Sequence, residues 1–151
     1  MKLSTKGRYG ARAMLDLALH FSEGGDPVSL GAIAERQNIS AEYLEQIFSS
    51  LRKSGLVESV RGAQGGYRLG RPAGKITVGD VLRVLEGSLS PVDCVHEDNP
   101  MPCERFEECV MKDVWRKMRD SINSTVDAIT LADLAEDYRT RRHKSDFMYF
   151  I

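Results

Sequence analysis

The sequence predicts a mainly α-helical chain with one small β-hairpin, and three observations support this expectation. Two short amphipathic segments, residues 30–37 and 40–54, are separated by a tight turn. A glycine-rich hairpin follows at residues 56–69, and an amphipathic helix over residues 109–129 lies further along the chain. Two helices joined by a tight turn and followed by a β-hairpin make a winged helix-turn-helix. We therefore expect a winged helix-turn-helix domain with a long dimerisation helix, assembled as a homodimer.

The first two helices are marked by apolar spacing and by residues that end helices. Residues 5–21 are expected to form the first helix, because apolar side chains recur there at helical intervals. These side chains are Ala11, Met14, Leu15, Ala18 and Phe21. The segment Gly24–Pro27 should stop this helix. Ser29 can cap the second helix, residues 30–37, and Asn38 can end it in a left-handed conformation.

The third helix combines an apolar stripe with a polar face. Ser40 can cap its N-terminus, and Gly55 follows its C-terminal end. The stripe consists of Leu44, Ile47, Phe48 and Leu51. The residues largely outside the stripe are Glu42, Tyr43, Glu45, Gln46, Ser49 and Ser50. Such a hydrogen-bonding face on the second helix of the pair is typical of a helix that enters the DNA major groove.

A β-hairpin and a capped helix are predicted next. Residues 56–60 alternate between apolar and polar side chains, and residues 67–69 form a shorter strand. The segment between the strands permits a close hairpin tip because it holds three glycines, Gly62, Gly65 and Gly66. Thr77 together with Asp80 is typical of a capping box, which predicts a helix over residues 78–86.

The C-terminal half begins with an irregular segment and continues with a long helix. Residues 87–108 hold three prolines and two of the three cysteines, without a helical or strand period, and Cys109 follows directly. The helix over residues 109–129 has an apolar side made of Val110, Val114, Met118, Ile122, Val126 and Ile129, with Trp115 beside it. A helix of this length spans about 30 Å, which is more than a small core covers. We expect it to pack on a second subunit; the alternative is that it folds back on its own core.

A short final helix capped by Thr130 and a tail complete the chain. The tail is basic from Arg139 onward and ends in the apolar run Phe147–Ile151, which could dock on the dimer or fray. We treat the whole as one structural domain with four parts. They are the DNA-binding region 1–75, the connecting helix and cysteine loop 76–108, the dimerisation helix and short final helix 109–137, and the tail 138–151.

Charge and composition restrict the class of protein. The net charge is −1, yet residues 1–75 carry +4 and residues 76–151 carry −5, so the basic half could face phosphate unless the difference arose by chance. No run approaches the roughly 18 apolar residues of a membrane span. The sequence shows no nucleophile–base pair and no phosphate-binding loop. We expect a cytoplasmic protein that has no membrane partner and is not an enzyme.

Residues that could read DNA lie on the third helix. The N-terminal residues of a recognition helix reach base edges, so Ser40, Tyr43 and Gln46 are the predicted readers. Ser40 could serve only as the cap, whereas the amide of Gln46 can pair with adenine. Glu45 could accept a hydrogen bond from cytosine N4, select against other bases, serve a metal site or remain solvated.

Further contacts to DNA are expected from basic residues. Arg61, next to Gly62 at the hairpin tip, can enter a minor groove that A·T-rich sequence has narrowed. Phosphate contacts are expected from Lys6, Arg8, Arg52 and Lys53, each of which could equally be an ordinary surface charge.

The three cysteines form the pattern Cys94-x8-Cys103-x5-Cys109, with His96 close to the first. In a chain expected to be cytoplasmic, such a group is more often a metal or redox site than a disulfide framework. The spacing fits neither a zinc finger nor a ferredoxin. Three thiolates and one further ligand would complete an iron-sulfur cluster or a closed zinc site, and three unligated thiols are the remaining alternative.

Several stretches together resemble the IscR and NsrR family of bacterial winged-helix regulators over nearly the whole chain. They are Leu3–Gly10, Tyr43–Phe48, Gly55–Val57, Val60–Gly62 and Gly65–Tyr67. The resemblance implies a homodimer with crossed long helices and a cysteine loop near the DNA-binding region. It also implies DNA contacts at Ser40, Tyr43, Glu45, Gln46 and Arg61, and cluster ligation by Cys94, Cys103 and Cys109.

The fourth cluster ligand departs from the family pattern. The IscR type has a histidine three residues after its third cysteine, where this chain has Lys112, and the NsrR type uses an aspartate of the partner subunit at the position of Arg8. This disfavours the nitric-oxide-sensing branch. The first gap between cysteines is also wider than is usual in IscR. The candidates that remain are His96, Glu45, Glu108 and Asp113. We favour Glu45, because a ligand on the recognition helix would couple the cluster to base reading, and a carboxylate ligand would make the cluster labile.

The expected function follows from these features. We expect a regulator that senses cluster or redox status through an iron-sulfur cluster, most simply [2Fe-2S], and that represses cluster-biogenesis genes from a palindromic operator in double-stranded DNA. One alternative is a regulator of the same fold that binds zinc or no metal and senses thiol metabolism. The other is an iron-sulfur carrier that does not bind DNA.

Overall fold

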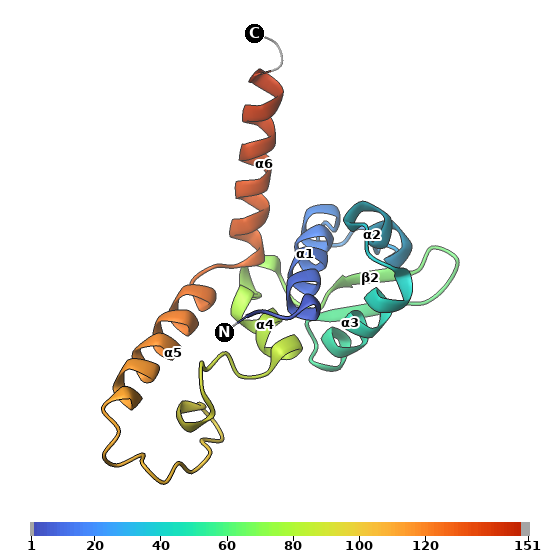
Figure 1. Ribbon diagram of the computed structural model, residues 1–151. Helices are drawn as coiled ribbons and strands as arrows, with labels where there is room; N and C mark the ends of the chain where they lie inside the picture. Colours follow the sequence, from blue (N-terminus) through green and yellow to red (C-terminus); the bar gives the residue numbers. More distant parts are fainter. Residues whose placement is uncertain (1, 149–151) are drawn as a thin grey trace.

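The computed structural model describes residues 2–148 as six α-helices and a two-stranded antiparallel sheet (Figure 1). The elements are α1 (Thr5–His20), α2 (Leu30–Gln37), α3 (Ala41–Lys53), β1 (Val57–Val60), β2 (Gly66–Leu69), α4 (Val78–Glu86), α5 (Met111–Asp127) and α6 (Leu131–Met148). Two short 3-10 turns lie at Ala73–Lys75 and Asp93–Val95. No helix within residues 2–148 is both long and apolar enough to cross a membrane.

Local hydrogen bonds set the helix ends where the sequence predicts them. The Ser29 hydroxyl accepts from the Ala32 amide at 3.2 Å, and Asn38 ends α2 with a φ of 53°. Thr77 and Asp80 form the predicted capping box of α4, with both reciprocal bonds at 3.0 Å. Each cap satisfies amide groups that a helix end would otherwise leave unpaired.

The core lies between α1, α2, α3, α4 and the hairpin. The apolar stripe of α3 is fully buried, as predicted. The buried face of α1 is centred differently from the expectation, since Ala13 and Leu17 are fully buried whereas Ala11 and Leu15 are only half-buried. The reason is the close packing of α1 on α4, where the absent side chain of Gly10 leaves the space that Leu85 fills.

The hairpin is held to the helical body by a short backbone bridge. β1 pairs with β2 from Val57 opposite Leu69 to Val60 opposite Gly66. Val28, which precedes α2, exchanges two backbone hydrogen bonds with Tyr67, at 2.8 and 2.7 Å. Gly66 lies directly against the Val28 carbonyl, so a side chain at this position would collide with backbone. The hairpin therefore projects as a wing from the body that α1, α2 and α3 form (Figure 1).

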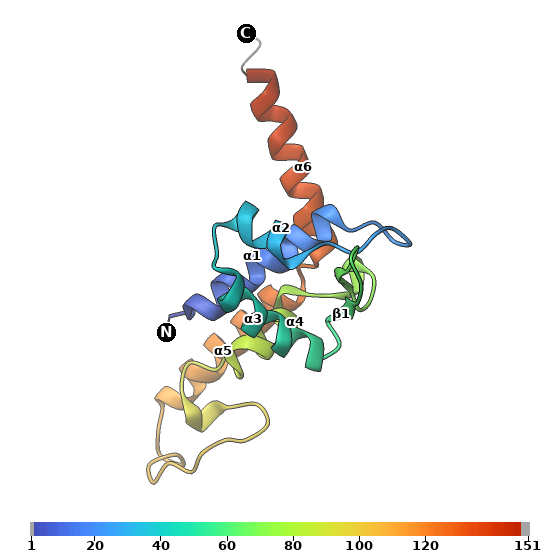
Figure 2. The same cartoon turned by 90° about the vertical axis from the view of Figure 1, so that its right-hand side faces the viewer.

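The C-terminal part differs from the expectation of a short final helix followed by a tail. α6 spans 18 residues and reaches Met148. Neither glycine nor proline interrupts this segment, and ion pairs at helical spacing join Arg139 to Glu136 and Arg141 to Asp137. Figure 2 shows α6 and the cysteine loop extending from opposite sides of the body. The last residues of the expected apolar tail, 149–151, and the side chain of Phe147 lie outside the described part.

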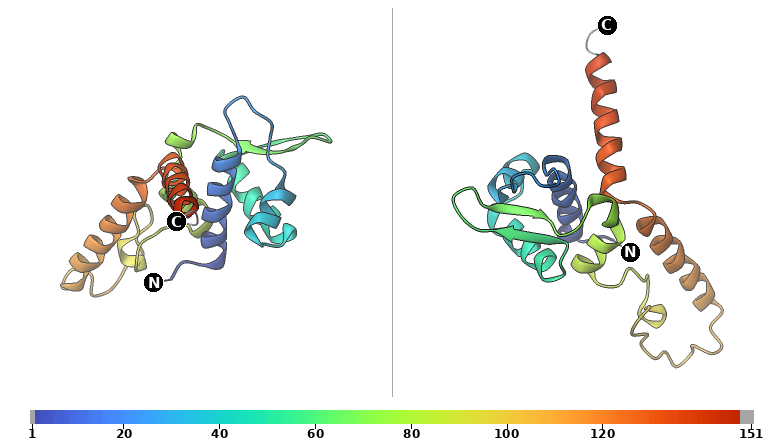
Figure 3. Two further views of the ribbon diagram at one scale, coloured as in Figure 1. Left: turned by 90° about the horizontal axis from the view of Figure 1, so that it is seen from above. Right: turned by 180° about the vertical axis from the view of Figure 1, so that it is seen from behind.

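The apolar side of α5 is divided along its length. Ile122 and Val126 are half-buried and share a hollow with Leu82 of α4, so this part folds back on its own chain. Towards the N-terminal end, Val110, Val114 and Met118 are 82%, 43% and 37% exposed. A monomer therefore leaves apolar surface uncovered on α5, which also lies at the edge of the body in all views (Figures 1 to 3).

Candidate nucleic-acid interface and cysteine loop

The polar face of α3 presents Glu45 and Gln46 to solvent. Both side chains are exposed, while the apolar stripe on the opposite face of the helix is buried in the core. Ser40 caps the helix, with its hydroxyl accepting from the Tyr43 amide at 3.3 Å. Ser40 is thus positioned at the helix end that would face a groove, with its hydroxyl oxygen already engaged in the cap.

Tyr43 is less free than the other predicted readers. Its ring packs edge to face against Tyr9 of α1, with centroids 6.1 Å apart, and the side chain is half-buried. The Arg12 guanidinium lies 5.7 Å from the Tyr9 ring on the same helix. Packing of this kind fixes the direction of the Tyr43 ring, so its hydroxyl is the part left to reach a ligand.

The wing tip places Arg61 in solvent. Arg61 follows β1 directly and is exposed, and Gly62 has a φ of 115°, which side chains rarely adopt. A Cβ on Gly65 would collide with the Val60 carbonyl, so the narrow turn requires glycine at positions 62 and 65. The arginine is carried on a thin loop beyond the sheet, which is the geometry that a minor-groove contact needs.

The predicted phosphate contacts are distributed over α1 and α3. Lys6 is half-buried, and its Nζ lies 3.5 Å from the Ser50 hydroxyl of α3. Arg8 is exposed and donates to the Thr5 hydroxyl at 3.3 Å. Arg52 and Lys53 are exposed in the last turn of α3. The Lys6 contact brings the start of α1 next to the C-terminal part of α3.

A buried ion pair that was not predicted from the sequence joins α1 to α2. Asp16 is 2% exposed, and Arg36 donates to both of its oxygens, with the shortest distance 2.6 Å. Gln37 adds a bond of 2.8 Å. The hydrogen bonds that Arg36 donates to Asp16 raise the pKa of Arg36 above its ordinary value. An acidic residue inside the apolar run of residues 13–19 was the available signal.

The three cysteines lie in the loop between α4 and α5 with free thiols. Cys94 and Cys103 line one hollow of about 340 Å³ together with Phe106, and Cys109 is half-buried just before α5. Within residues 2–148, no three histidine, cysteine or acidic side chains are close enough together to hold a metal. Thiols that are outside the core and free of disulfides are suitable donors for an iron-sulfur cluster. A cluster would require the loop to rearrange so that the three thiols come together.

The candidate fourth ligands lie at different distances from this loop. His96 is half-buried, and its Nδ1 accepts from the amides of Asp98 and Asn99 at 3.2 and 3.1 Å. Glu108 is exposed, and Asp113 pairs with Arg116 at 3.4 Å. Glu45 belongs to α3, and within one chain this helix lies apart from the cysteine loop (Figures 1 to 3).

Lys112 stands at the position where the IscR type has its histidine, and it contacts the end of the cysteine loop. Its Nζ donates to the Glu107 carbonyl at 3.2 Å and lies 4.9 Å from the centre of the Phe106 ring. Arg116 lies 5.3 Å from the same ring. The two cations therefore hold Phe106, which lines the cysteine hollow, against the start of α5.

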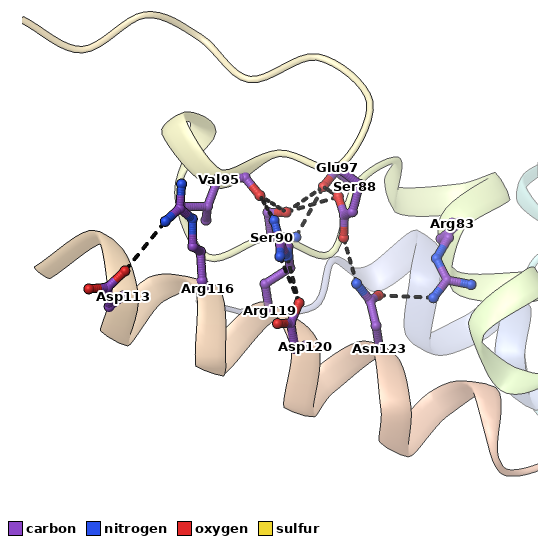
Figure 4. Close-up of polar contacts among 10 residues, drawn as sticks. All are labelled: Arg83, Ser88, Ser90, Val95, Glu97, Asp113, Arg116, Arg119, Asp120 and Asn123. Carbon is purple, nitrogen blue, oxygen red and sulfur yellow. Dashed lines mark hydrogen bonds and ion pairs between the residues drawn. The ribbon is translucent and has the colours of Figure 1, made fainter. Parts of the chain in front are cut away.

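A hydrogen-bonded network fixes the first part of the loop to α5 and α4 (Figure 4). Glu97 accepts from the Ser88 and Ser90 hydroxyls at 2.6 and 2.9 Å and from the Asn123 amide at 2.6 Å. Partial burial opposes ionisation of Glu97, but these hydrogen bonds outweigh it and lower its pKa to about 2. Asn123 in turn accepts from Arg83 at 2.9 Å. No sequence signal pointed to this network, because Asn123 is 26 residues from Glu97 and 40 from Arg83 along the chain.

Comparison with known proteins identifies relatives along nearly the full chain. The Rrf2 family model, described as an iron-dependent transcriptional regulator, matches residues 3–137. The HTH-type transcriptional regulator CymR of Bacillus subtilis is 43% identical over 151 residues, 100% of both chains. The HTH-type transcriptional regulator IscR of Xenorhabdus nematophila is 45% identical over 137 residues, 91% of this chain and 80% of the relative.

Solved structures of two such proteins have the same fold. The structure of CymR, described as the global cysteine regulator of B. subtilis, has a TM-score of 0.71 at 47% identity, covering 90% of this chain and 97% of that one. The structure of T. potens IscR has a TM-score of 0.72 at 51% identity, covering 91% and 88%. The predicted winged-helix fold is confirmed, and these relatives are named as regulators rather than enzymes. The chain belongs to the Rrf2 family of transcriptional regulators.

Proposed function

We propose that this chain is a homodimeric repressor whose affinity for a palindromic operator depends on an iron-sulfur cluster. The observation that carries the proposal is the cysteine loop: three free thiols, two of them lining one hollow, lie in an irregular segment outside the DNA-binding body. Similarity to IscR relatives supports the same function.

The exposed apolar residues of α5 support the dimer. Val110, Val114 and Met118 would be buried if α5 packed against its copy across a two-fold axis. A two-fold dimer also matches a palindromic operator, because each subunit presents one α3 to one half-site. Lys6, Arg8, Arg52, Lys53 and Arg61 would then supply phosphate and minor-groove contacts, while Ser40, Tyr43, Glu45 and Gln46 would face the bases.

Cys94, Cys103 and Cys109 would hold the cluster, and we propose Glu45 as the fourth ligand. Because Glu45 lies apart from the loop of its own chain, this ligand would come from the second subunit. His96 is the alternative within the loop, since its Nε2 is not used in the hydrogen bonds to Asp98 and Asn99. The cluster would supply bonds that constrain the loop, and [2Fe-2S] is the simplest type for one set of four ligands.

Regulation then requires that the loaded and empty forms bind the operator with different affinities. The size of the effect equals the difference in binding free energy between the two forms, and operator DNA must change cluster affinity by the same factor.

The experiment is anaerobic purification and reconstitution, followed by iron and sulfide counts, an absorption spectrum and operator titrations of both forms. We expect visible absorption and a change in operator affinity of at least about fivefold. Cys103→Ala should abolish the absorption and the difference. If reconstituted wild-type protein showed no iron-sulfur absorption, or if both forms bound the operator equally, the cluster-dependent function would be refuted.

A second candidate is a regulator that senses thiol metabolism with zinc or without metal. The observation that favours it is the similarity to CymR over the full length of both chains, at an identity close to that of the IscR relatives. Metal analysis of the anaerobically purified protein separates the two: zinc or no metal, with no sulfide, would favour the CymR-like function.

A further inference from the structure

The cysteine loop consists of an anchored part and a loosely held part. Residues 98–110 make hydrogen bonds that, among the described residues, stay within residues 93–112. The segment that carries Cys94 is tied to other elements instead. The Val95 carbonyl accepts from Arg119 of α5 at 2.9 Å, and the Val95 side chain is 3% exposed. Cys94 is therefore close to bonds that reach α5, whereas Cys103 and Cys109 lie in a part whose hydrogen bonds stay within the loop and the start of α5, with Phe106 packed against Lys112 and Arg116.

Glu97 closes the anchored part and joins three segments at one carboxylate. One oxygen accepts from Ser88 and Ser90, which follow α4, and the other accepts from Asn123 on α5 (Figure 4). A charged acceptor strengthens each of these bonds relative to a neutral one. The carboxylate thus fixes the chain a few residues after Cys94.

Asn123 transmits this contact to α4 in one defined orientation. Its amide nitrogen donates to Glu97 at 2.6 Å, and its amide oxygen accepts from Arg83 at 2.9 Å. The reversed amide would place its hydrogens against a guanidinium and its oxygen against a carboxylate, which is unfavourable at both ends. Arg83 is also held by Asp127 of α5 through two bonds of 2.8 Å.

α4 connects Arg83 to the DNA-binding body. Glu86, at the end of α4, accepts from the Ser4 amide at 2.9 Å and from its hydroxyl at 2.5 Å, and Ser4 caps α1. Leu85 fills the space over Gly10, next to Ile47 on the buried face of α3. A displacement of α4 would therefore also shift α1 and the recognition helix, because a close-packed core has low compressibility and transmits strain.

We propose that Glu97 is a positioning residue that couples the cysteine loop to the recognition helix through Asn123, Arg83 and α4. This inference rests on the proposed cluster-dependent function. Glu97 fixes the end of the loop that holds Cys94. Rearrangement of the other end, residues 98–110, would therefore shift α5 and α4. The quantity to test is the coupling itself, which is the effect of the cluster on operator affinity.

The test compares operator affinity of the cluster-loaded and empty forms of each variant, and takes the ratio of the two dissociation constants. Glu97→Ala removes all three hydrogen bonds. Asp98→Ala is the matched control, since it removes a neighbouring exposed carboxylate whose side chain has no bond among the described residues. Glu97→Gln retains an acceptor oxygen and should recover part of the ratio. We expect Glu97→Ala to load the cluster with the wild-type spectrum and to reduce the ratio about threefold or more toward unity, while Asp98→Ala keeps the wild-type ratio.

An unchanged ratio in fully loaded Glu97→Ala would overturn the proposal. If that variant does not fold or load, Asn123→Ala decides, because its change lies on α5 outside the loop. Loading with a reduced ratio would support the coupling, and an unchanged ratio would refute it. The double variant, with Glu97→Ala and Asn123→Ala together, should reduce the ratio no more than the single variant with the larger effect, since both residues belong to one network. A wild-type protein that takes up no cluster would refute the proposed function itself, and the positioning role with it.

Discussion

Replacing Arg36 by alanine should destabilise the protein because it removes the guanidinium that pairs with the buried Asp16 carboxylate at 2.6 Å. Asp16 is 2% exposed and receives three contacts from Arg36, at 3.1, 3.1 and 2.6 Å. Removing one partner of a fully buried pair typically costs about 3–5 kcal/mol. Arg36 is 35% exposed, and Gln37 would still donate to Asp16 at 2.8 Å, so we expect about 2–3 kcal/mol here.

Urea unfolding followed by circular dichroism measures this change. With a slope of about 2 kcal/mol per M, the midpoint should fall by about 1–1.5 M. Arg68→Ala is the matched control, since it breaks an ion pair of 2.9 Å whose partners, Arg68 and Glu58, are 52% and 51% exposed. An exposed pair should contribute less than about 1 kcal/mol. Equal shifts of the midpoint for the two variants would refute the conclusion that the ion pair between Arg36 and Asp16 stabilises the packing of α1 on α2.

The remaining predictions concern DNA binding, helix packing and assembly. Arg61→Ala should weaken operator binding by about 1–3 kcal/mol and relax the preference at A·T-rich positions in fluorescence titrations; a uniform loss across sequences would make Arg61 a phosphate contact. Gly10→Ala should destabilise by about 1–3 kcal/mol in thermal unfolding, because the new methyl group collides with Leu85. Gly31→Ala, in open space on α2, should be neutral or stabilising; similar losses would contradict the packing argument. Val114→Glu should yield monomers in sedimentation, whereas Ser124→Glu on an exposed side of α5 should not.

The features that the sequence predicted well are those decided by neighbouring residues. The Thr77–Asp80 capping box and the left-handed Asn38 depend on groups within one helical turn. The stripe of α3 repeats every three or four residues, so its buried side follows from spacing alone. The length of α6 was underestimated because Thr130 identifies where a helix starts, whereas its end depends on the absence of a breaker over the following turns.

Features that depend on distant partners were not predictable in the same way. Asp16 was visible as a charge among apolar residues, but nothing in the spacing identified Arg36 as its partner. Tyr43 belongs to the polar side of α3 by spacing, yet Tyr9 of another helix draws it into a half-buried position. The cysteine spacing identifies donor atoms and leaves the path of the loop undetermined, so the relation of Cys109 to the other two thiols had to come from the structure.

The separation of the cysteine loop from α3 restricts how the loop can influence DNA binding. One proposed route passes between subunits, through Glu45 as a ligand, and the other passes within the chain, through Glu97, Asn123 and α4. The first route requires an assembled dimer, because Glu45 and the loop are apart in one chain. The second route remains intact in a monomer. In a monomeric Val114→Glu variant the cluster would have only ligands of its own chain, with His96 as the alternative fourth ligand, so any contribution from Glu45 should be lost. Glu97→Ala should still reduce the ratio of the half-site dissociation constants of the empty and loaded forms in that background.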